Sequence, residues 1–163
     1  MSTTTIRFAS PDDVPIILDF IKGLAAFENE LDAVKTTQAD LRRDGFGPRP
    51  KFEVLIAELD AEPVGFALFF LTYSTWEGRP SLYLEDLFVV ESARKHGVGR
   101  QLMAQLAALA VERGYQRLDL QVLDWNPARK FYHRLDMDHM HDWLPYRLEG
   151  QALQKLAQES EQQ

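Results

Sequence analysis

The stretch Tyr83–Met103, "YLEDLFVVESARKHGVGRQLM", joins an apolar strand-like run to a helix-like run through a basic loop with two glycines. Two neighbouring acids, Glu85 and Asp86, interrupt the apolar run. The apolar positions around them are Leu82, Leu84, Leu87 and Val89. Because these positions change phase across the acids, the pattern predicts a β-bulge there. The pattern alone fits a functional carboxylate at Glu85 and a solvated one equally well. It leaves Asp86 either paired with a cation or facing a substrate.

The loop from Arg94 to Arg100 predicts an anion site. The start of the following helix offers free backbone N–H groups and the positive end of the helix dipole. Gly97 and Gly99 allow close approach to the backbone, while Arg94, Lys95 and Arg100 supply positive charge. A diphosphate suits these donors better than a carboxylate does. The alternative is a tight turn with solvated cations.

The spacing of the glycines distinguishes among three known kinds of nucleotide-binding loop. A Walker A loop needs Gly-Lys-Ser/Thr, but Arg100 and Gln101 follow Gly99. A dinucleotide fingerprint needs a third glycine where Leu102 stands. The remaining pattern is Arg94-x-x-Gly97-x-Gly99.

The rest of the chain alternates strand-like and helix-like segments without a linker. Ser10 and Pro11 predict a helix start, and Gly45 and Gly114 predict helix ends. Asn126 with Pro127 predicts a further helix start. We predict strands over 5–9, 52–60, 62–74, 81–90 and 117–123, helices over 10–28, 36–45, 97–113 and 126–135, and a strand followed by a closing helix over 141–158. This order predicts one α/β domain over residues 1–163, with a mixed, largely antiparallel sheet flanked by helices and a frayed tail after about residue 158.

Composition limits the classes of function. The chain has 163 residues, 45% of them hydrophobic and 26% charged, with a formal net charge of −7 and no cysteine. The negative charge argues against general nucleic-acid binding. The N-terminal residues lack the features of a signal peptide, and the longest apolar run, Val64–Tyr73, is about half of a membrane span. We therefore expect a cytoplasmic protein without a membrane segment.

The motifs, taken in order, resemble the GNAT N-acetyltransferases along nearly the whole chain. Arg94-x-x-Gly97-x-Gly99 matches the loop that grips the pyrophosphate of coenzyme A in that superfamily. The segments "LAAFE", "DGFG", "YSTWEGRPSLYLEDLFV" and "VLDWN" resemble the diamine (spermidine/spermine) acetyltransferase family. "YSTW" and "VLDWN" are more similar to its thialysine-acetylating branch.

This resemblance implies a GNAT-like fold, acetyl-CoA as co-substrate without a metal, a small primary amine as acceptor, and a homodimer. It implies that Tyr132 is the general acid and that Glu85 accepts the amine proton. It places Phe27, Glu28, Glu85 and Asp86 beside the amine. The implied contacts to acetyl-CoA are Leu87, Phe88, Val89, Arg94, Lys95, His96, Gly97, Val98, Gly99, Arg100 and Asn126.

The chain departs from the family pattern in three places. "NPARKFY", from Asn126 to Tyr132, is one residue shorter than usual. Asp136 replaces a customary turn glycine. Ser74 stands where polyamine-type members carry an acid, which disfavours a long polyamine.

Several residues keep an alternative interpretation. Tyr132, next to Phe131, fits a core aromatic residue. Arg129, Lys130 and Arg134 fit a solvated helix face as well as a contact to the 3′-phosphate of the adenosine. His139 and His141 have the spacing of two metal ligands but lack a recognisable third. The alternative functions are acetylation of a protein, peptide or aminoglycoside, or acetyl-CoA sensing without turnover.

Overall fold

The computed structural model describes residues 2–162, and the chain forms two compact units, Met1–Leu123 and Asp124–Gln163. The first unit contains the sheet and three α-helices. The second contains two α-helices joined by an irregular segment.

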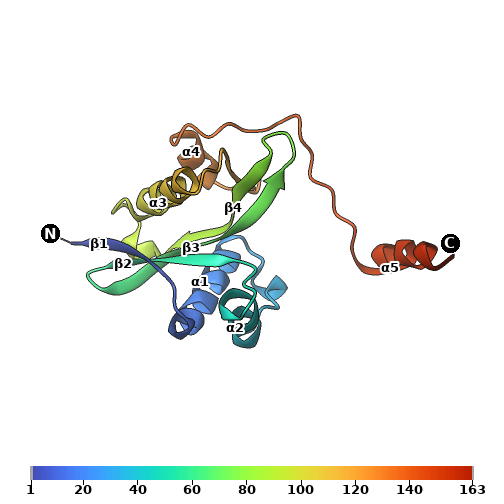
Figure 1. Cartoon of the computed structure of the whole chain (residues 1–163). Helices are drawn as coiled ribbons and strands as arrows, with labels where there is room; N and C mark the ends of the chain where they lie inside the picture. Colours follow the sequence, from blue (N-terminus) through green and yellow to red (C-terminus); the bar gives the residue numbers. More distant parts are fainter. Residues whose placement is uncertain (1, 163) are drawn as a thin grey trace. The chain divides into compact units, whose positions relative to one another are not determined.

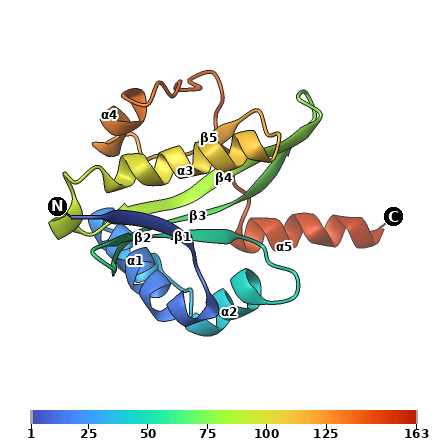
Figure 2. The ribbon, with the colours of Figure 1, turned by 60° about the vertical axis from the view of Figure 1, so that its left-hand side comes forward.

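The first unit is built on a five-stranded sheet in the order β1-β2-β3-β4-β5 (Figure 1, with β5 labelled in Figure 2). The first four strands are antiparallel to their neighbours, and β5 pairs in parallel with β4. The strands are β1 (Thr4–Phe8), β2 (Glu53–Leu59), β3 (Glu62–Ser74), β4 (Arg79–Val89) and β5 (Leu118–Leu120). The predicted mixed, largely antiparallel sheet is therefore confirmed.

Helices cover both faces of the sheet, as Figure 2 shows. One face carries α1 (Val14–Phe27), which continues from a 3-10 turn at Pro11–Asp13, and α2 (Gln38–Phe46). The other face carries α3 (Val98–Glu112), and short 3-10 turns occur at Leu31–Ala33 and Glu91–Ala93. The second unit contains α4 (Ala128–His133), α5 (Gly150–Gln158) and a final 3-10 turn at Glu159–Gln162.

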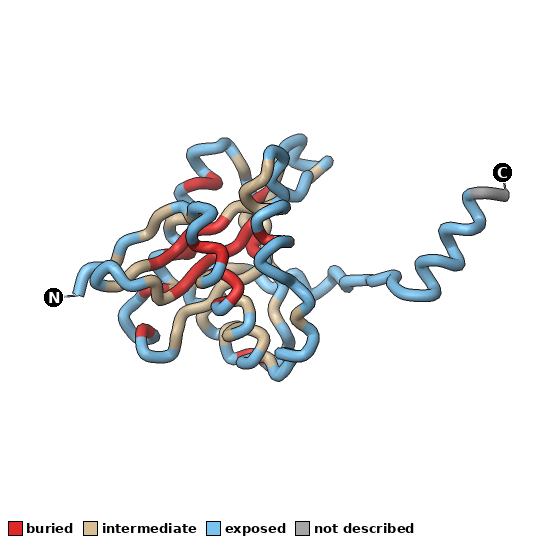
Figure 3. Tube along the Cα trace, turned by 90° about the horizontal axis from the view of Figure 1, so that it is seen from below, coloured by how far each residue is buried: buried red, intermediate tan, exposed pale blue. Residues whose placement is uncertain are grey.

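The core lies between the sheet and its helices, where Figure 3 shows the buried part of the trace. On the α1 side, Phe20 stacks on Phe66 with the ring centroids 5.5 Å apart. The buried residues of this layer are Val14, Ile17, Leu18, Phe20, Leu41, Val54, Ile56, Phe66 and Leu68. On the α3 side, Leu102 and Leu106 are fully buried. Alternate side chains of β2 and β3 therefore contribute to two apolar layers, one on each face of the sheet.

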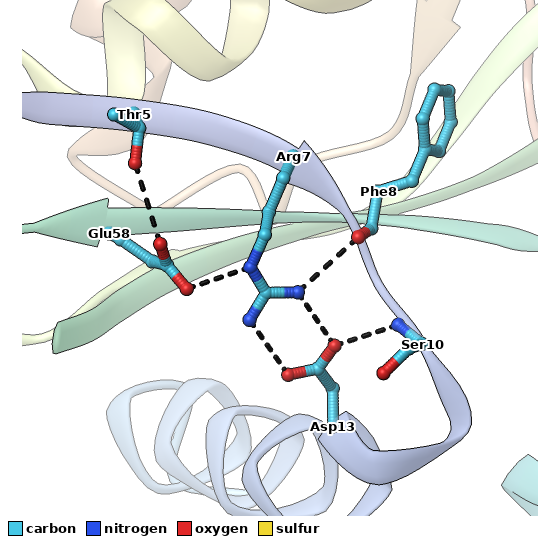
Figure 4. A network of polar contacts seen from close by, with 6 residues as sticks. All are labelled: Thr5, Arg7, Phe8, Ser10, Asp13 and Glu58. Atoms are coloured by element: carbon cyan, nitrogen blue, oxygen red, sulfur yellow. Dashed lines mark hydrogen bonds and ion pairs between the residues drawn. The ribbon is translucent and has the colours of Figure 1, made fainter. Parts of the chain in front are cut away.

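A partly buried ion-pair network fixes the start of α1 to the sheet edge (Figure 4). Arg7 on β1 donates to both carboxylate oxygens of Asp13 at 2.8 and 2.9 Å, and its Nε donates to Glu58 on β2 at 2.7 Å. Asp13 also accepts the backbone N–H of Ser10, which completes the predicted N-terminal cap. The Arg7 guanidinium holds the pKa of Asp13 below its usual range.

The predicted elements form with one exception. The predicted strand within residues 141–149 does not form, because this segment carries no regular structure and all of its residues are exposed. A strand needs a partner and a face to bury, and Pro145 within the segment has no N–H to donate to a ladder. The predicted strand at 117–123 is also shortened to Leu118–Leu120.

Candidate active site

A bulge in β4 turns two consecutive carboxylates toward one side of the sheet. Leu68 on β3 lies opposite Asp86, whereas the next residue, Phe69, lies opposite Leu84, so Glu85 is the extra residue. In a regular strand, neighbouring side chains point to opposite faces, whereas a bulge sets two residues against one. The predicted bulge is therefore confirmed.

Both carboxylates line a cavity of about 450 Å³ on the face of the sheet that α1 and α2 cover. Its strand wall is formed by Leu68, Glu85 and Asp86. Its helix wall, α2 with the preceding loop, contributes Lys35, Thr36, Asp40, Leu41, Arg43 and Asp44, and Ile21 and Phe52 complete the lining. The cavity is within the usual size range of small-molecule sites.

The charge of the strand wall depends on pH. Burial and, to a smaller extent, the negative charges of Glu85 and Glu28 together raise the pKa of Asp86 to about 7. Burial also raises the pKa of Glu28, at the end of α1, with a smaller effect from Glu30. Three of the four residues predicted to surround an amine thus form one acidic group. Such a group favours a cationic ligand.

Beyond the bulge, β4 is no longer paired with β5, so its edge on that side is open. The parallel ladder pairs Leu82, Tyr83 and Leu84 with β5 and extends no further along β4. The N–H of Val90 bonds to β3, so strand alternation directs the backbone groups of Leu87 and Val89 to the β5 side. The Val89 carbonyl accepts a hydrogen bond there from Arg94 Nε at 2.9 Å. The remaining groups can pair with an extended ligand.

Arg94 connects this open edge to the end of α1. Its guanidinium carbon lies 5.5 Å from the ring centroid of Phe27 and 5.7 Å from that of Phe88. Cation–π contacts at such distances are stabilising. The structure therefore gives Arg94 and Phe27, which were predicted for different ligands, a direct contact with each other.

The glycine loop forms a tight entry to α3. Lys95 and Gly97 both have left-handed backbone angles, with φ of 76° and 73°. The ring of His96 turns back to the carbonyl of Ala93 at 3.3 Å. Val98 is buried, so its side chain belongs to the core and only its backbone faces the loop. A left-handed turn at a helix N-terminus gathers backbone N–H groups into an anion-binding concavity.

In the second unit, Asn126 lies two residues before the start of α4, and Tyr132 is the last but one residue of this helix. Asn126 is buried, and its Oδ1 accepts the N–H of Ala128, the first residue of α4, at 2.9 Å. The N-cap position is held by Pro127, one residue later than predicted. The ring of Tyr132 lies 5.3 Å from that of Phe131. Asp136 adopts φ of 61°, so the turn keeps a left-handed residue although glycine is absent. The roles assigned to Asn126 and Tyr132 stay predictions.

The histidine pair of the second unit has a local partner. The rings of His139 and His141 are 6.2 Å apart, and His141 Nε2 lies 3.3 Å from Asp142. Within residues 2–162, no group of three His, Cys, Asp or Glu side chains is placed to hold a metal ion. In the same range, none of the helices is long and apolar enough to cross a membrane.

Sequence reasoning missed the helix wall of the cavity. Lys35, Asp40, Arg43 and Asp44 line it, but none of them was predicted as a site residue. The signal available was the dense run of charges in "DLRRD" on a short helix. A charge run usually marks a solvated face, and only the tertiary position of α2 distinguishes the two cases.

Residues 22–137 match the Acetyltransferase (GNAT) family. The chain is 37% identical to the thialysine N-epsilon-acetyltransferase of Mus musculus, covering 96% of this chain and 99% of the relative. It is 38% identical to the spermidine/spermine N(1)-acetyltransferase-like protein 1 of Homo sapiens, over 94% of this chain but 24% of that protein.

Among solved structures, an integron cassette protein from the mobile metagenome of V. cholerae has a TM-score of 0.78 and 28% identity, covering 94% of this chain and 97% of the other. The family match extends over most of the chain, from α1 through α4. The chain belongs to the GNAT acetyltransferase family.

Proposed function

We propose that this enzyme transfers an acetyl group directly from acetyl-CoA to a small primary amine. The observation that carries the proposal is the bulge in β4. It supplies two carboxylates to a cavity on the α1 and α2 side, and it directly precedes a strand edge that is open for hydrogen bonding. An amine and an extended thioester donor can thus reach the same short segment of β4 from different directions.

The reaction has two proton transfers to manage. A primary ammonium with a pKa of roughly 10.4 must lose a proton before its nitrogen attacks the thioester carbonyl. Glu85 accepts this proton directly or through water. Asp86, with its pKa raised to about 7, is a second acceptor matched to neutral pH. As the nitrogen–carbon bond forms and the carbon–sulfur bond breaks, Tyr132 protonates the departing thiolate.

The remaining catalysis comes from position and polarisation. The backbone of Leu87 to Val89 holds the acetyl and pantetheine portion, and an N–H of this segment polarises the carbonyl. The loop from Lys95 to Arg100 binds the diphosphate, with its charge complemented by the start of α3. Asn126 provides a further contact. The chain has no cysteine to form a covalent thioester intermediate, in keeping with direct transfer.

The acceptor range follows from the cavity. A volume of about 450 Å³ suits a diamine, thialysine or a lysine-like amino acid better than a folded protein. The mouse relative is named for thialysine and the human one for spermidine and spermine, and all three are small amines.

A thiol-release assay with acetyl-CoA and a panel of amines tests the proposal. We expect thiol release with at least one small amine, and a loss of about 10²–10⁴-fold in kcat for Tyr132→Phe. Tyr146→Phe is the matched control, since Tyr146 lies in the same unit and is 93% exposed. Glu85→Gln should lower kcat and shift its pH profile. Unchanged turnover in Tyr132→Phe would refute the acid, and acetyl-CoA binding without thiol release would indicate a sensor.

We further propose a cytoplasmic homodimer. The cysteine-free composition requires no oxidising compartment. The second unit exposes large apolar side chains, which on a soluble protein commonly mark an interaction surface. They include Met140, Leu144, Tyr146, Leu153 and Leu156.

A further inference from the structure

The two walls of the cavity carry different charges. The strand wall has only acids, Glu85 and Asp86. The helix wall has two cations, Lys35 and Arg43, and two acids, Asp40 and Asp44. An acceptor amine needs only the strand wall to hold its reacting ammonium. The mixed helix wall therefore calls for a separate explanation.

Arg43 is held in place but keeps donors available. Its Nη1 lies 3.1 Å from Asp40, its Nη2 donates to Asp44 at 2.7 Å, and its Nε donates to Asp44 at 3.0 Å. A guanidinium has five N–H groups, so two of them, one on each Nη, are outside these three contacts. The side chain is 66% exposed, and water or a ligand can reach those two groups.

This arrangement matches the head group of an α-amino acid. Its carboxylate suits the fork of Arg43 and the ammonium of Lys35, and its α-ammonium suits Asp40 and Asp44. A polyamine has cations along its length and no anion. It would therefore leave the two remaining N–H groups of Arg43 and the ammonium of Lys35 without an acceptor, whereas a carboxylate would engage them.

We propose that Arg43 and Lys35 bind the α-carboxylate of the acceptor, and that the acceptor is a zwitterionic amino acid with a terminal side-chain amine. The terminal ammonium lies against Glu85 and Asp86, while the head group lies against α2. This inference rests on the proposed function and makes Arg43 a specificity-determining residue. The apolar side chains of Ile21, Leu41, Phe52 and Leu68 line the space for the methylene chain.

Lysine and cadaverine test this assignment, because they differ only in the carboxylate. We expect the wild-type enzyme to have the higher kcat/KM for lysine. In Arg43→Gln the ratio of kcat/KM for lysine to that for cadaverine should fall about 10–100-fold, mainly through KM for lysine. Activity on cadaverine should stay the same or rise, since Asp40 and Asp44 lose their cation. Lys35→Gln should change the ratio in the same direction by a smaller factor.

Arg42→Gln is the matched control. Arg42 is the neighbouring exposed arginine of α2; it contacts Gln38 at 3.3 Å and is not part of the cavity lining. Its substitution should leave the ratio unchanged. Equal losses on both amines in Arg43→Gln, an unchanged ratio, or the same effect from Arg42→Gln would each overturn the inference. If wild type prefers cadaverine, this inference fails and the proposed function stands; if no amine releases thiol, the proposed function itself fails.

Discussion

Glu85 and Asp86 show how one extra residue changes the chemistry of a strand. Without the bulge, one of the two carboxylates would point to the α3 side, into the layer that contains Leu84 and Leu102. With it, both line the cavity, where the charge of Glu85 raises the cost of ionising Asp86. Two neighbouring negative charges are therefore unfavourable in the free enzyme, and the ammonium of the proposed acceptor would offset them.

Asp86 should make the enzyme less stable as the pH rises. Its pKa is about 7 in the folded chain and near 3.9 when unfolded, so the folded state binds more protons between these values. Stability must then fall with increasing pH through this window. From pH 5 to pH 8, Asp86→Asn should gain about 2–3 kcal/mol in free energy of unfolding relative to wild type. Urea denaturation at both pH values measures this gain.

The control for this measurement is Asp19→Asn, an exposed aspartate on α1. It should shift the free energy of unfolding by a similar amount at both pH values. A difference between wild type and Asp86→Asn that does not change with pH would contradict the shifted pKa.

At the scale of elements, α3 begins and ends at glycines with the same backbone requirement. Gly97 before the helix has φ of 73°, and Gly114 after it has φ of 75°. A side-chain Cβ would meet no atom within 4 Å at either position. Alanine at each site therefore costs only backbone strain, about 1–2 kcal/mol. The two sites differ in what lies beside them, because only Gly97 belongs to the anion loop.

Alanine variants of these two glycines distinguish an effect on stability from an effect on cofactor binding. Gly97→Ala and Gly114→Ala should lose similar free energy of unfolding. Only Gly97→Ala should raise KM for acetyl-CoA, by about 5–50-fold, because the loop N–H groups move away from the diphosphate. Denaturation and steady-state kinetics on both variants provide the test. A similar rise in KM for Gly114→Ala would contradict the proposal that the loop at Gly97 binds the diphosphate.

At the scale of the whole molecule, local patterns predicted the elements better than the site. Periodicity, Ser10 and the glycines around α3 predicted most helices and strands, because these signals act over a few residues. The phase change around Glu85 even predicted the bulge. The prediction of a strand around Pro145 was wrong, because the apolar residues of this segment resemble a strand but bury no face. The helix wall with Arg43 could not be predicted, because it depends on where α2 packs against the sheet.

The exposed apolar residues of the second unit predict self-association. Leu153 and Leu156 lie three positions apart on α5, hence on one face, and are about half exposed. We expect sedimentation equilibrium to give twice the chain mass of 18.7 kDa. Replacing both leucines with glutamate should shift the protein toward the monomer, whereas Lys155→Glu on the same helix should not. A wild-type monomer at micromolar concentration would contradict the proposed homodimer.

The acidic bulge also bears on how a catalytic cycle ends. In the proposed mechanism, acetylation turns a cationic amine into a neutral amide, so the reaction removes the positive charge that Glu85 and Asp86 bind. Glu85 and Asp86 then face a product that cannot offset their repulsion, and water solvates them better than the amide does. The chemical step thus favours release of the product without a conformational change. The enzyme should consequently tolerate accumulated product, because the acetylated amine competes poorly with fresh substrate for the same strand.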